Sequence, residues 1–67
     1  MINLYTLPTC GICQLIKKKL IAKNIKYNEY SLEDYITILN TDRAPVLQVG
    51  EQLFTSPTDI NNWINEQ

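Results

Sequence analysis

The sequence predicts a single α/β domain over residues 1–67, with elements in the order β-α-β-α-β-β-α. The chain has 67 residues, 45% of them hydrophobic, which suffices for one small core and is too short for a second domain. Segments that alternate apolar and polar residues are separated by segments with helical spacing, a pattern typical of α/β domains. A strand–helix–strand unit followed by a hairpin predicts a mixed sheet of four strands.

The first half of the chain predicts a strand followed by a helix. Residues 2–6 alternate in polarity and are rich in strand formers, and Pro8 interrupts backbone pairing soon afterwards. A helix is expected from Cys10 to about Lys23, with Asn24 as its stop. Its apolar residues recur with helical spacing and predict one buried face: Ile12, Leu15, Ile16 and Leu20.

A second strand and a short second helix are expected next. Residues 25–30 alternate again, and because a helix connects them to the first strand, the two strands should be parallel. Ser31 and Asp34 have the spacing of a capping box, which predicts a short helix running to Leu39. Residues 40–43 then form a loop.

The last third of the chain predicts a hairpin and a final helix. Residues 44–49 and 52–54 flank Gly50-Glu51, the spacing of two antiparallel strands joined by a tight turn. Residues 56–59, Ser-Pro-Thr-Asp, are typical of a helix start. The helix that follows has one apolar stripe for packing on the sheet: Ile60, Trp63 and Ile64.

The charge and hydropathy of the chain exclude several classes of function. The net charge is −1, although residues 1–28 hold five lysines and no acid. Nucleic-acid binding requires a basic excess that the chain lacks. No apolar run is long enough to span a bilayer, and the first ten residues do not have the pattern of a signal peptide. We therefore expect a soluble, cytoplasmic protein that acts as a monomer and binds neither nucleic acid nor membrane.

Cys10 and Cys13 are the residues that point to chemistry. A disulfide between them would enclose only Gly11 and Ile12, and so short a loop gives little stabilisation. Cys10 stands at the predicted helix N-terminus, where unpaired N–H groups and the helix dipole favour a nucleophilic thiolate. Cys13 lies one turn further on the same face and can resolve a mixed disulfide formed at Cys10. The spacing predicts a redox-active dithiol.

Two alternatives to a redox pair stay open at this point. A zinc site needs four ligands, and the chain has two cysteines and no histidine, so only a metal shared between two chains would work. The two thiols could also be incidental, structural residues. In either case the protein would be a non-enzymatic binding module. We expect no bound metal and no bound cofactor.

The segment Tyr5-Thr6-Leu7-Pro8-Thr9-Cys10-Gly11-Ile12-Cys13 resembles the active-site segment of glutaredoxins and of glutaredoxin-like NrdH-redoxins. Ala44-Pro45-Val46 matches the segment of this family that contains its conserved proline, and Asp59-Ile60 matches the start of its last helix. The resemblance implies a thioredoxin-like fold with helices on both faces of the sheet and a cis peptide bond at Pro45. It also implies a thiol–disulfide oxidoreductase that carries electrons to protein or mixed disulfides.

The resemblance assigns roles to nine residues. Cys10 and Cys13 are the implied catalytic residues, and the implied substrate-binding residues are Pro8, Thr9, Gly11, Ile12, Ala44, Pro45 and Asp59. The implied partners are disulfide-containing proteins, ribonucleotide reductase among them. Electrons would come from glutathione or from thioredoxin reductase. Thr55-Ser56 stands where glutaredoxins have a glycine pair for close approach of glutathione, which favours the reductase.

Overall fold

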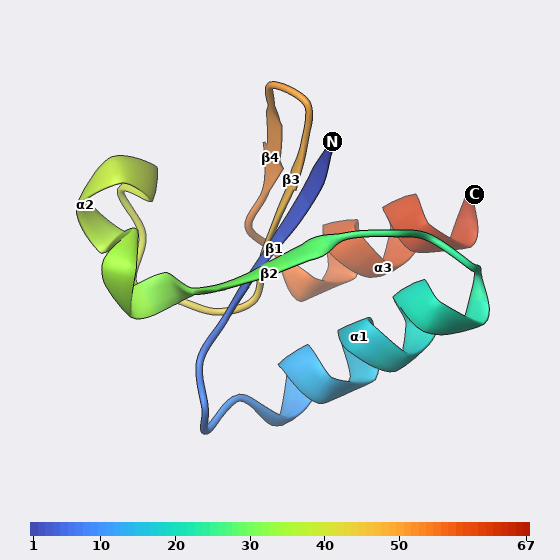
Figure 1. Cartoon of the computed structure of the whole chain (residues 1–67), viewed down its shortest axis with the longest axis horizontal. Helices are drawn as coiled ribbons and strands as arrows, with labels where there is room; N and C mark the ends of the chain where they lie inside the picture. The colour runs from blue at the N-terminus through green and yellow to red at the C-terminus, as the bar shows by residue number, and fades with distance from the viewer.

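The computed structural model describes all 67 residues, and its elements follow the predicted order (Figure 1). The elements are β1 (Ile2–Thr6), α1 (Gly11–Ala22), β2 (Asn28–Ser31), the 3-10 turn η1 (Leu32–Asp34), α2 (Ile36–Leu39), β3 (Val46–Val49), β4 (Gln52–Phe54) and α3 (Pro57–Asn65). The strand order is β2-β1-β3-β4. β1 runs parallel to β2 and antiparallel to β3, and β4 is antiparallel to β3. The predicted mixed sheet of four strands is confirmed.

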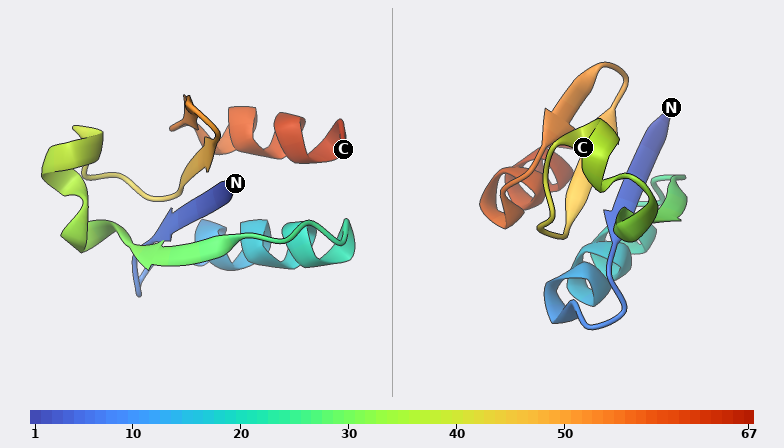
Figure 2. Two further views of the ribbon diagram at one scale, coloured as in Figure 1. Left: turned by 45° about the horizontal axis from the view of Figure 1, so that its top comes forward. Right: turned by 90° about the vertical axis from the view of Figure 1, so that its left-hand side faces the viewer.

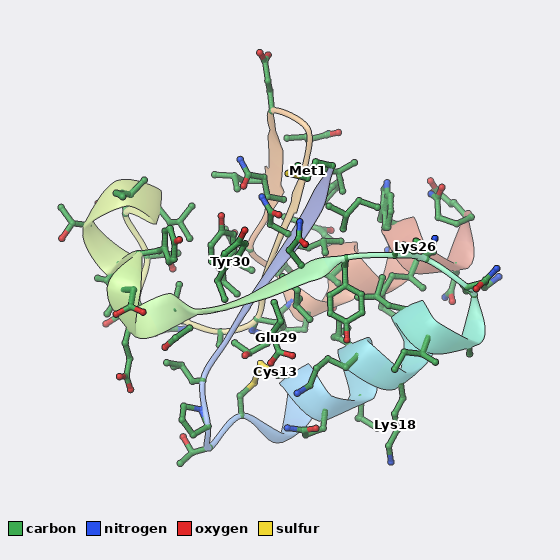
Figure 3. All side chains as sticks on the ribbon, in the orientation of Figure 1. Met1, Cys13, Lys18, Lys26, Glu29 and Tyr30 are labelled. Carbon is green, nitrogen blue, oxygen red and sulfur yellow. A yellow bond between two sulfur atoms is a disulfide. The ribbon has the colours of Figure 1, made fainter.

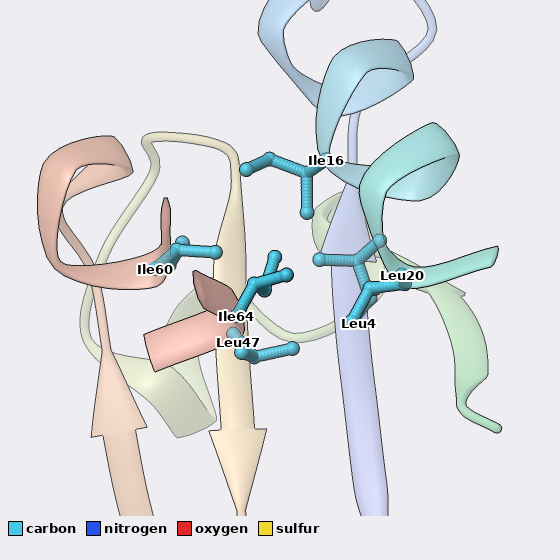
Figure 4. Packing of buried hydrophobic residues seen from close by; sticks show 6 residues of the cluster. All are labelled: Leu4, Ile16, Leu20, Leu47, Ile60 and Ile64. Atoms are coloured by element: carbon cyan, nitrogen blue, oxygen red, sulfur yellow. The ribbon is translucent and has the colours of Figure 1, made fainter. Parts of the chain in front are cut away.

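Helices α1 and α3 pack side by side against one face of the sheet (Figure 4). Leu4 of β1 and Leu47 of β3 are partners in the antiparallel register and point to this face together. The principal core consists of Leu4, Ile16, Leu20, Leu47, Ile60 and Ile64. Each helix thus buries its apolar stripe against the two central strands.

The opposite face of the sheet holds a second, smaller cluster. Successive side chains of a strand alternate between faces, so Tyr5 and Val46 point away from α1 and α3 and pack with Leu32. Rings of Tyr30 and Tyr35 lie 5.7 and 5.0 Å from that of Tyr5. Leu39 of α2 packs against this cluster, and Figures 1 and 2 show α2 at the end of the molecule away from the C-terminus. Helical segments therefore lie on both faces, as predicted.

Tyr5 is almost completely buried, and its hydroxyl donates a hydrogen bond of 3.0 Å to Gln48 Oε1. Burial raises the pKa of Tyr5 above its ordinary value of 10.0, and the Tyr35 and Tyr30 phenols raise it further. The side chain of Asn3 acts on this pKa in the other direction. The side chain is a structural tyrosine of the sheet.

The buried face of α1 differs from the predicted one. Cys13, Ile16 and Leu20 are buried, whereas Ile12 and Leu15 are 47% and 58% exposed. Positions 13, 16 and 20 form one narrow stripe on a helix with 3.6 residues per turn, and positions 12 and 15 lie to the side of it. The prediction for Ile12 and Leu15 is wrong because Cys13, not Ile12, begins the buried stripe.

The segment after α1 is also less regular than predicted. Asn24 ends the helix in the left-handed conformation (φ 59°), but β2 begins at Asn28 and not at residue 25. Ile25 and Tyr27 pack against the principal core before the strand begins. The Ser31 side chain makes no capping hydrogen bond, and Tyr35 (φ −125°, ψ 7°) separates η1 from α2. The predicted capping box and continuous helix are therefore wrong.

The C-terminal hairpin and helix follow the prediction closely. Gly50 takes the left-handed conformation that the turn requires (φ 61°). β3 starts at Val46 because Pro45 has no N–H to donate to the sheet. Pro57 is the first residue of α3, and Ser56 caps the helix without a side-chain hydrogen bond. None of the helices has the length and apolar character needed to cross a membrane.

Candidate functional site

The dithiol lies at the junction of β1 and α1. β1 is a central strand, paired on both sides, and the chain leaves it through a turn closed by a 3.1 Å hydrogen bond from Cys10 N–H to Leu7 C=O. Pro8 and Thr9 at the tip of this turn are exposed. The turn delivers Cys10 to the N-cap position of α1. A rigid strand and a rigid helix thus fix both ends of the segment that bears the cysteines.

Cys10 and Cys13 form a disulfide, and their Cα atoms are 5.3 Å apart (Figure 3). The Cys10 Sγ accepts a 3.1 Å hydrogen bond from the Cys13 N–H. Cys10 is partly exposed, whereas Cys13 is fully buried. Cys10 is therefore the more accessible of the two cysteines, and Cys13 lies behind it, close enough to form a bond with it.

The N-terminus of α1 determines the electrostatic environment of Cys10. The first turn of α1 contains no acidic residue, so nothing there opposes a negative charge. The free N–H groups and the positive end of the helix dipole favour an anion at the N-cap. When the disulfide is reduced, these groups stabilise the thiolate of Cys10 and make it the better nucleophile.

Ala44 and Pro45 enter the sheet at the same end at which β1 leaves it for the dithiol. Val46, the next residue, pairs with Tyr5 near the end of β1. The Ala44–Pro45 peptide bond is cis. Pro45 is fully buried, and Ala44 is half-buried against the second cluster. The structure thus brings the loop before β3 and the loop before α1 to one end of the molecule.

Two open clefts border the dithiol segment on its two sides. One, of about 410 Å³, lies between this segment and β2, and its lining includes Leu7, Pro8 and Gln14. The other, of about 270 Å³, lies between α1 and α3, and its lining includes Ile12 and Thr58. Ile12 lies between the two cysteines in the sequence, and its exposed side chain lines the second cleft.

Asp59 belongs to neither of these clefts. It is exposed in the first turn of α3 and lines a separate cleft with residues of β4 and of the C-terminal part of α3. The other predicted substrate-binding residues lie in the loop at Pro8 and Thr9, in the first turn of α1, or in the loop at Ala44 and Pro45. The structure therefore sets Asp59 apart from them.

A polar network in the cleft between the dithiol segment and β2 was not predicted. Glu29 Oε2 lies 3.2 Å from Lys17 Nζ and accepts a 2.9 Å hydrogen bond from Thr6 Oγ1. The three residues come from α1, β1 and β2. In the sequence, the helical spacing of Cys13 and Lys17 is the only signal of this network, because Glu29 joins it through strand pairing.

No group of three or more His, Cys, Asp or Glu side chains in the chain is arranged to hold a metal ion. The dithiol has no third ligand nearby. A metal at Cys10 and Cys13 would require ligands from a second chain.

No family model matches the sequence, and a search of curated proteins returns no match. Solved structures do match the fold. The glutaredoxin-like NrdH-redoxin of Escherichia coli aligns over 91% of this chain and 91% of its own, with 17% identity and a TM-score of 0.71. A thioredoxin-like protein aligns over 96% of this chain and 99% of its own, with 17% identity and a TM-score of 0.79.

Glutathione transferases contain the same fold as part of a longer chain. A glutathione-S-transferase from Xylella fastidiosa aligns over 98% of this chain, with 20% identity and a TM-score of 0.82. This chain spans about a third (35%) of the length of that transferase. Together these likenesses show a thioredoxin fold, which the order of the elements and the sheet topology independently support.

Proposed function

We propose that this protein is a small thiol–disulfide oxidoreductase that reduces protein or mixed disulfides through Cys10 and Cys13. The observation that supports this proposal is that the two cysteines differ in exposure and in position on the helix. Cys10 is partly exposed at a helix N-terminus, and Cys13 is fully buried and within bonding distance behind it. Nucleophilic attack is favoured at an accessible thiol on a helix N-terminus, and resolution of a mixed disulfide needs a second thiol within bonding distance of the first.

The proposed reaction has two steps. The Cys10 thiolate attacks a substrate disulfide, forms a mixed disulfide with one substrate sulfur and releases the other as a thiolate. The Cys13 thiol then loses its proton, and its thiolate attacks the Cys10 Sγ. The Cys10–Cys13 bond forms, and the second substrate thiolate leaves and takes up a proton. Two electrons pass from the protein dithiol to the substrate, and an external thiol or reductase returns them.

Substrate alignment is assigned to the loops around the dithiol. The backbone N–H and C=O of Ala44 are proposed to pair with an extended substrate chain, in a short form of strand addition. Pro45 shapes this loop, and residues 8, 9, 11 and 12 form the rim that an incoming disulfide meets. Asp59 is proposed as an acceptor for an amino group of a ligand that extends to the N-terminus of α3.

A flavin-dependent thioredoxin reductase is the proposed electron donor, with glutathione as the competing candidate. Thr55 and Ser56 carry side chains where a close approach of glutathione would need glycines. Ribonucleotide reductase is the proposed physiological acceptor within the class of disulfide-containing proteins. The cytoplasm, where dithiols are kept reduced, is the proposed location. The protein is proposed to act as a monomer.

Steady-state reduction of a disulfide substrate tests the function and the donor together. The protein is supplied in parallel with thioredoxin reductase and with glutathione plus glutathione reductase. We expect turnover that Cys10→Ser abolishes, and we expect Cys13→Ser to accumulate a mixed disulfide that mass spectrometry detects. Full activity of Cys10→Ser would refute the mechanism. Silence with both donors, or partner binding that survives loss of both thiols, would favour a non-enzymatic binding module.

A further inference from the structure

We propose that the cleft between β4 and α3 binds an arginine side chain from an extended segment of a partner protein. The cleft has a volume of about 370 Å³, and none of its lining residues belongs to the dithiol segment. Its lining consists of two carboxylates, two amides and two aromatic rings: Gln52, Phe54, Asp59, Asn62, Trp63 and Glu66. The inference goes beyond the proposed redox function and does not depend on it.

The α3 residues of this cleft lie on one face of the helix. Positions 59, 62, 63 and 66 recur with helical spacing, so their side chains are neighbours along two turns. The other faces of α3 are already in use, because one packs in the principal core and another contacts Lys19 of α1 through Asn61. The face that borders β4 is therefore the one left free for a ligand.

Phe54 and Trp63 form an aromatic wall of the cleft. Their ring centroids are 6.4 Å apart, and both side chains are half-buried against the principal core. The core thus holds the two rings in place, while both also line the cleft. The face of an aromatic ring attracts a cation, and tryptophan does so most strongly.

The cleft contains two negative charges and no positive one. Asp59 and Glu66 line it, and no lysine or arginine does. The single ion pair of the chain joins Lys17 and Glu29, so neither carboxylate of the cleft has a cationic partner. Trp63 follows Asp59 by four residues and precedes Glu66 by three, which places it one helical turn from each. A cation on the indole ring is therefore attracted by both carboxylates.

A guanidinium group fits these surroundings better than other cations do. It is planar and stacks on an aromatic ring, and its fork of N–H donors matches the geometry of a carboxylate. The ammonium group of lysine is compact and strongly hydrated, and it has no flat face. A metal ion lacks ligands, since no three His, Cys, Asp or Glu side chains are arranged to hold one.

The position of β4 favours a protein as the source of the arginine. β4 is an outer strand of the sheet with one free edge, and its residues Gln52 and Phe54 line the cleft. A free edge can pair with an extended segment of another chain. Alternate side chains of such a segment point to the face of the sheet that carries α3, where the cleft lies.

Tryptophan fluorescence gives a direct binding assay, because Trp63 is the only tryptophan of the chain. The oxidised protein is titrated with the capped peptide acetyl-Thr-Val-Arg-Val-Thr-amide and with versions that contain citrulline or lysine in place of arginine. Citrulline keeps the shape of arginine and lacks its charge. N-acetylarginine amide presents the same side chain without the flanking residues.

We expect a saturable change in fluorescence with the arginine peptide and none with the citrulline peptide. The lysine peptide should bind more weakly, because its ammonium group cannot stack on the ring. N-acetylarginine amide should bind about tenfold more weakly, because it makes fewer backbone hydrogen bonds with the edge of β4. Added salt should weaken the binding of the arginine peptide, since the carboxylates of the cleft are exposed.

Three substitutions separate the contributions of charge and ring. Asp59→Asn and Glu66→Gln keep the shape of each side chain and remove its charge, so each should weaken binding about threefold and the double variant about tenfold. Phe54→Leu removes a ring and should also weaken binding about threefold. Glu51→Gln is the matched control, because Glu51 is an exposed acid outside the cleft, and it should bind as wild type does. If Phe54→Leu does not fold, Phe54→Met replaces it.

Several results would overturn the proposal. Equal binding of the arginine and citrulline peptides would do so, as would equal affinity of wild type and the double variant. N-acetylarginine amide that binds as tightly as the peptide would assign the cleft to a small molecule instead. Self-association that Arg43→Gln abolishes would assign it to a second copy of the chain, whose only arginine is Arg43. A protein that binds the peptide but reduces no disulfide would refute only the proposed function.

Discussion

Two adjacent residues of α1 give a direct test of how this helix packs. Ile16 is 3% exposed in the principal core, and its neighbour Leu15 is 58% exposed. Ile16→Ala removes three buried carbon atoms, worth about 2.4 kcal/mol at about 0.8 kcal/mol for each. The cavity left behind raises the expected loss to about 3 kcal/mol, inside the range of about 2 to 5 kcal/mol for such substitutions. Leu15→Ala should change the free energy of unfolding by about 0.5 kcal/mol or less.

Urea unfolding of the oxidised proteins, followed by circular dichroism, measures both effects. A slope of about 1 kcal/mol per molar urea places the Ile16→Ala midpoint about 3 M below wild type. A domain of 67 residues has a total stability of about 3 to 10 kcal/mol, so Ile16→Ala should be marginally folded. Thermal unfolding should show a midpoint about 12 to 24 °C lower. Equal losses for Ile16→Ala and Leu15→Ala would refute the assignment of the buried stripe.

Three further predictions concern the turn, the helix start and the buried tyrosine. Gly50→Ala forces a side chain into the left-handed region (φ 61°) and should cost about 1 to 2 kcal/mol in urea unfolding. Gly11→Ala, where a Cβ meets nothing within 4 Å, should instead stabilise α1 by up to about 1 kcal/mol; a loss at Gly11 would contradict the helix assignment. Tyr5→Phe loses the 3.0 Å hydrogen bond to Gln48 and should cost about 0.5 to 1.5 kcal/mol. Because the folded-state pKa of Tyr5 is raised, its contribution is complete below pH 10 and is lost as pH rises above that value. The difference in unfolding free energy between wild type and Tyr5→Phe should therefore change only above about pH 10. A change at neutral pH would contradict the assignment of this pH dependence to ionisation of Tyr5.

The sequence predicted what depends on local pattern. Alternation located β1, the Gly50-Glu51 turn located the hairpin, and the Ser-Pro start located α3, because each of these signals lies within a few adjacent residues. The position of Cys10 at a helix N-terminus followed from the same kind of local signal. These features were sufficient for the fold class and for the dithiol.

The features that the sequence did not predict depend on contacts between distant segments. Glu29 reaches Lys17 and Thr6 only because β2 pairs in parallel with β1 in one particular register. The spacing of Ser31 and Asp34 predicted a capping box and a continuous helix. In the structure the helix is interrupted at Tyr35, whose ring packs against that of Tyr5. Residues 25–27 alternate like a strand, yet they form the connection that carries the chain from α1 to the sheet.

The central position of β1 and β3 has a consequence for local unfolding. Strands β1 and β3 each have a hydrogen-bonded neighbour on both sides, whereas β2 and β4 each have one free edge. The outer strands are therefore the ones that we expect to fray. The turn to Cys10 is attached to β1, and the loop through Ala44 and Pro45 is attached to β3. When either outer strand opens, β1 and β3, to which the two loops are attached, therefore stay paired with each other. We expect the amide hydrogens of these two strands to exchange most slowly. The geometry around the two sulfur atoms can persist through fluctuations that transiently expose the edges of the sheet.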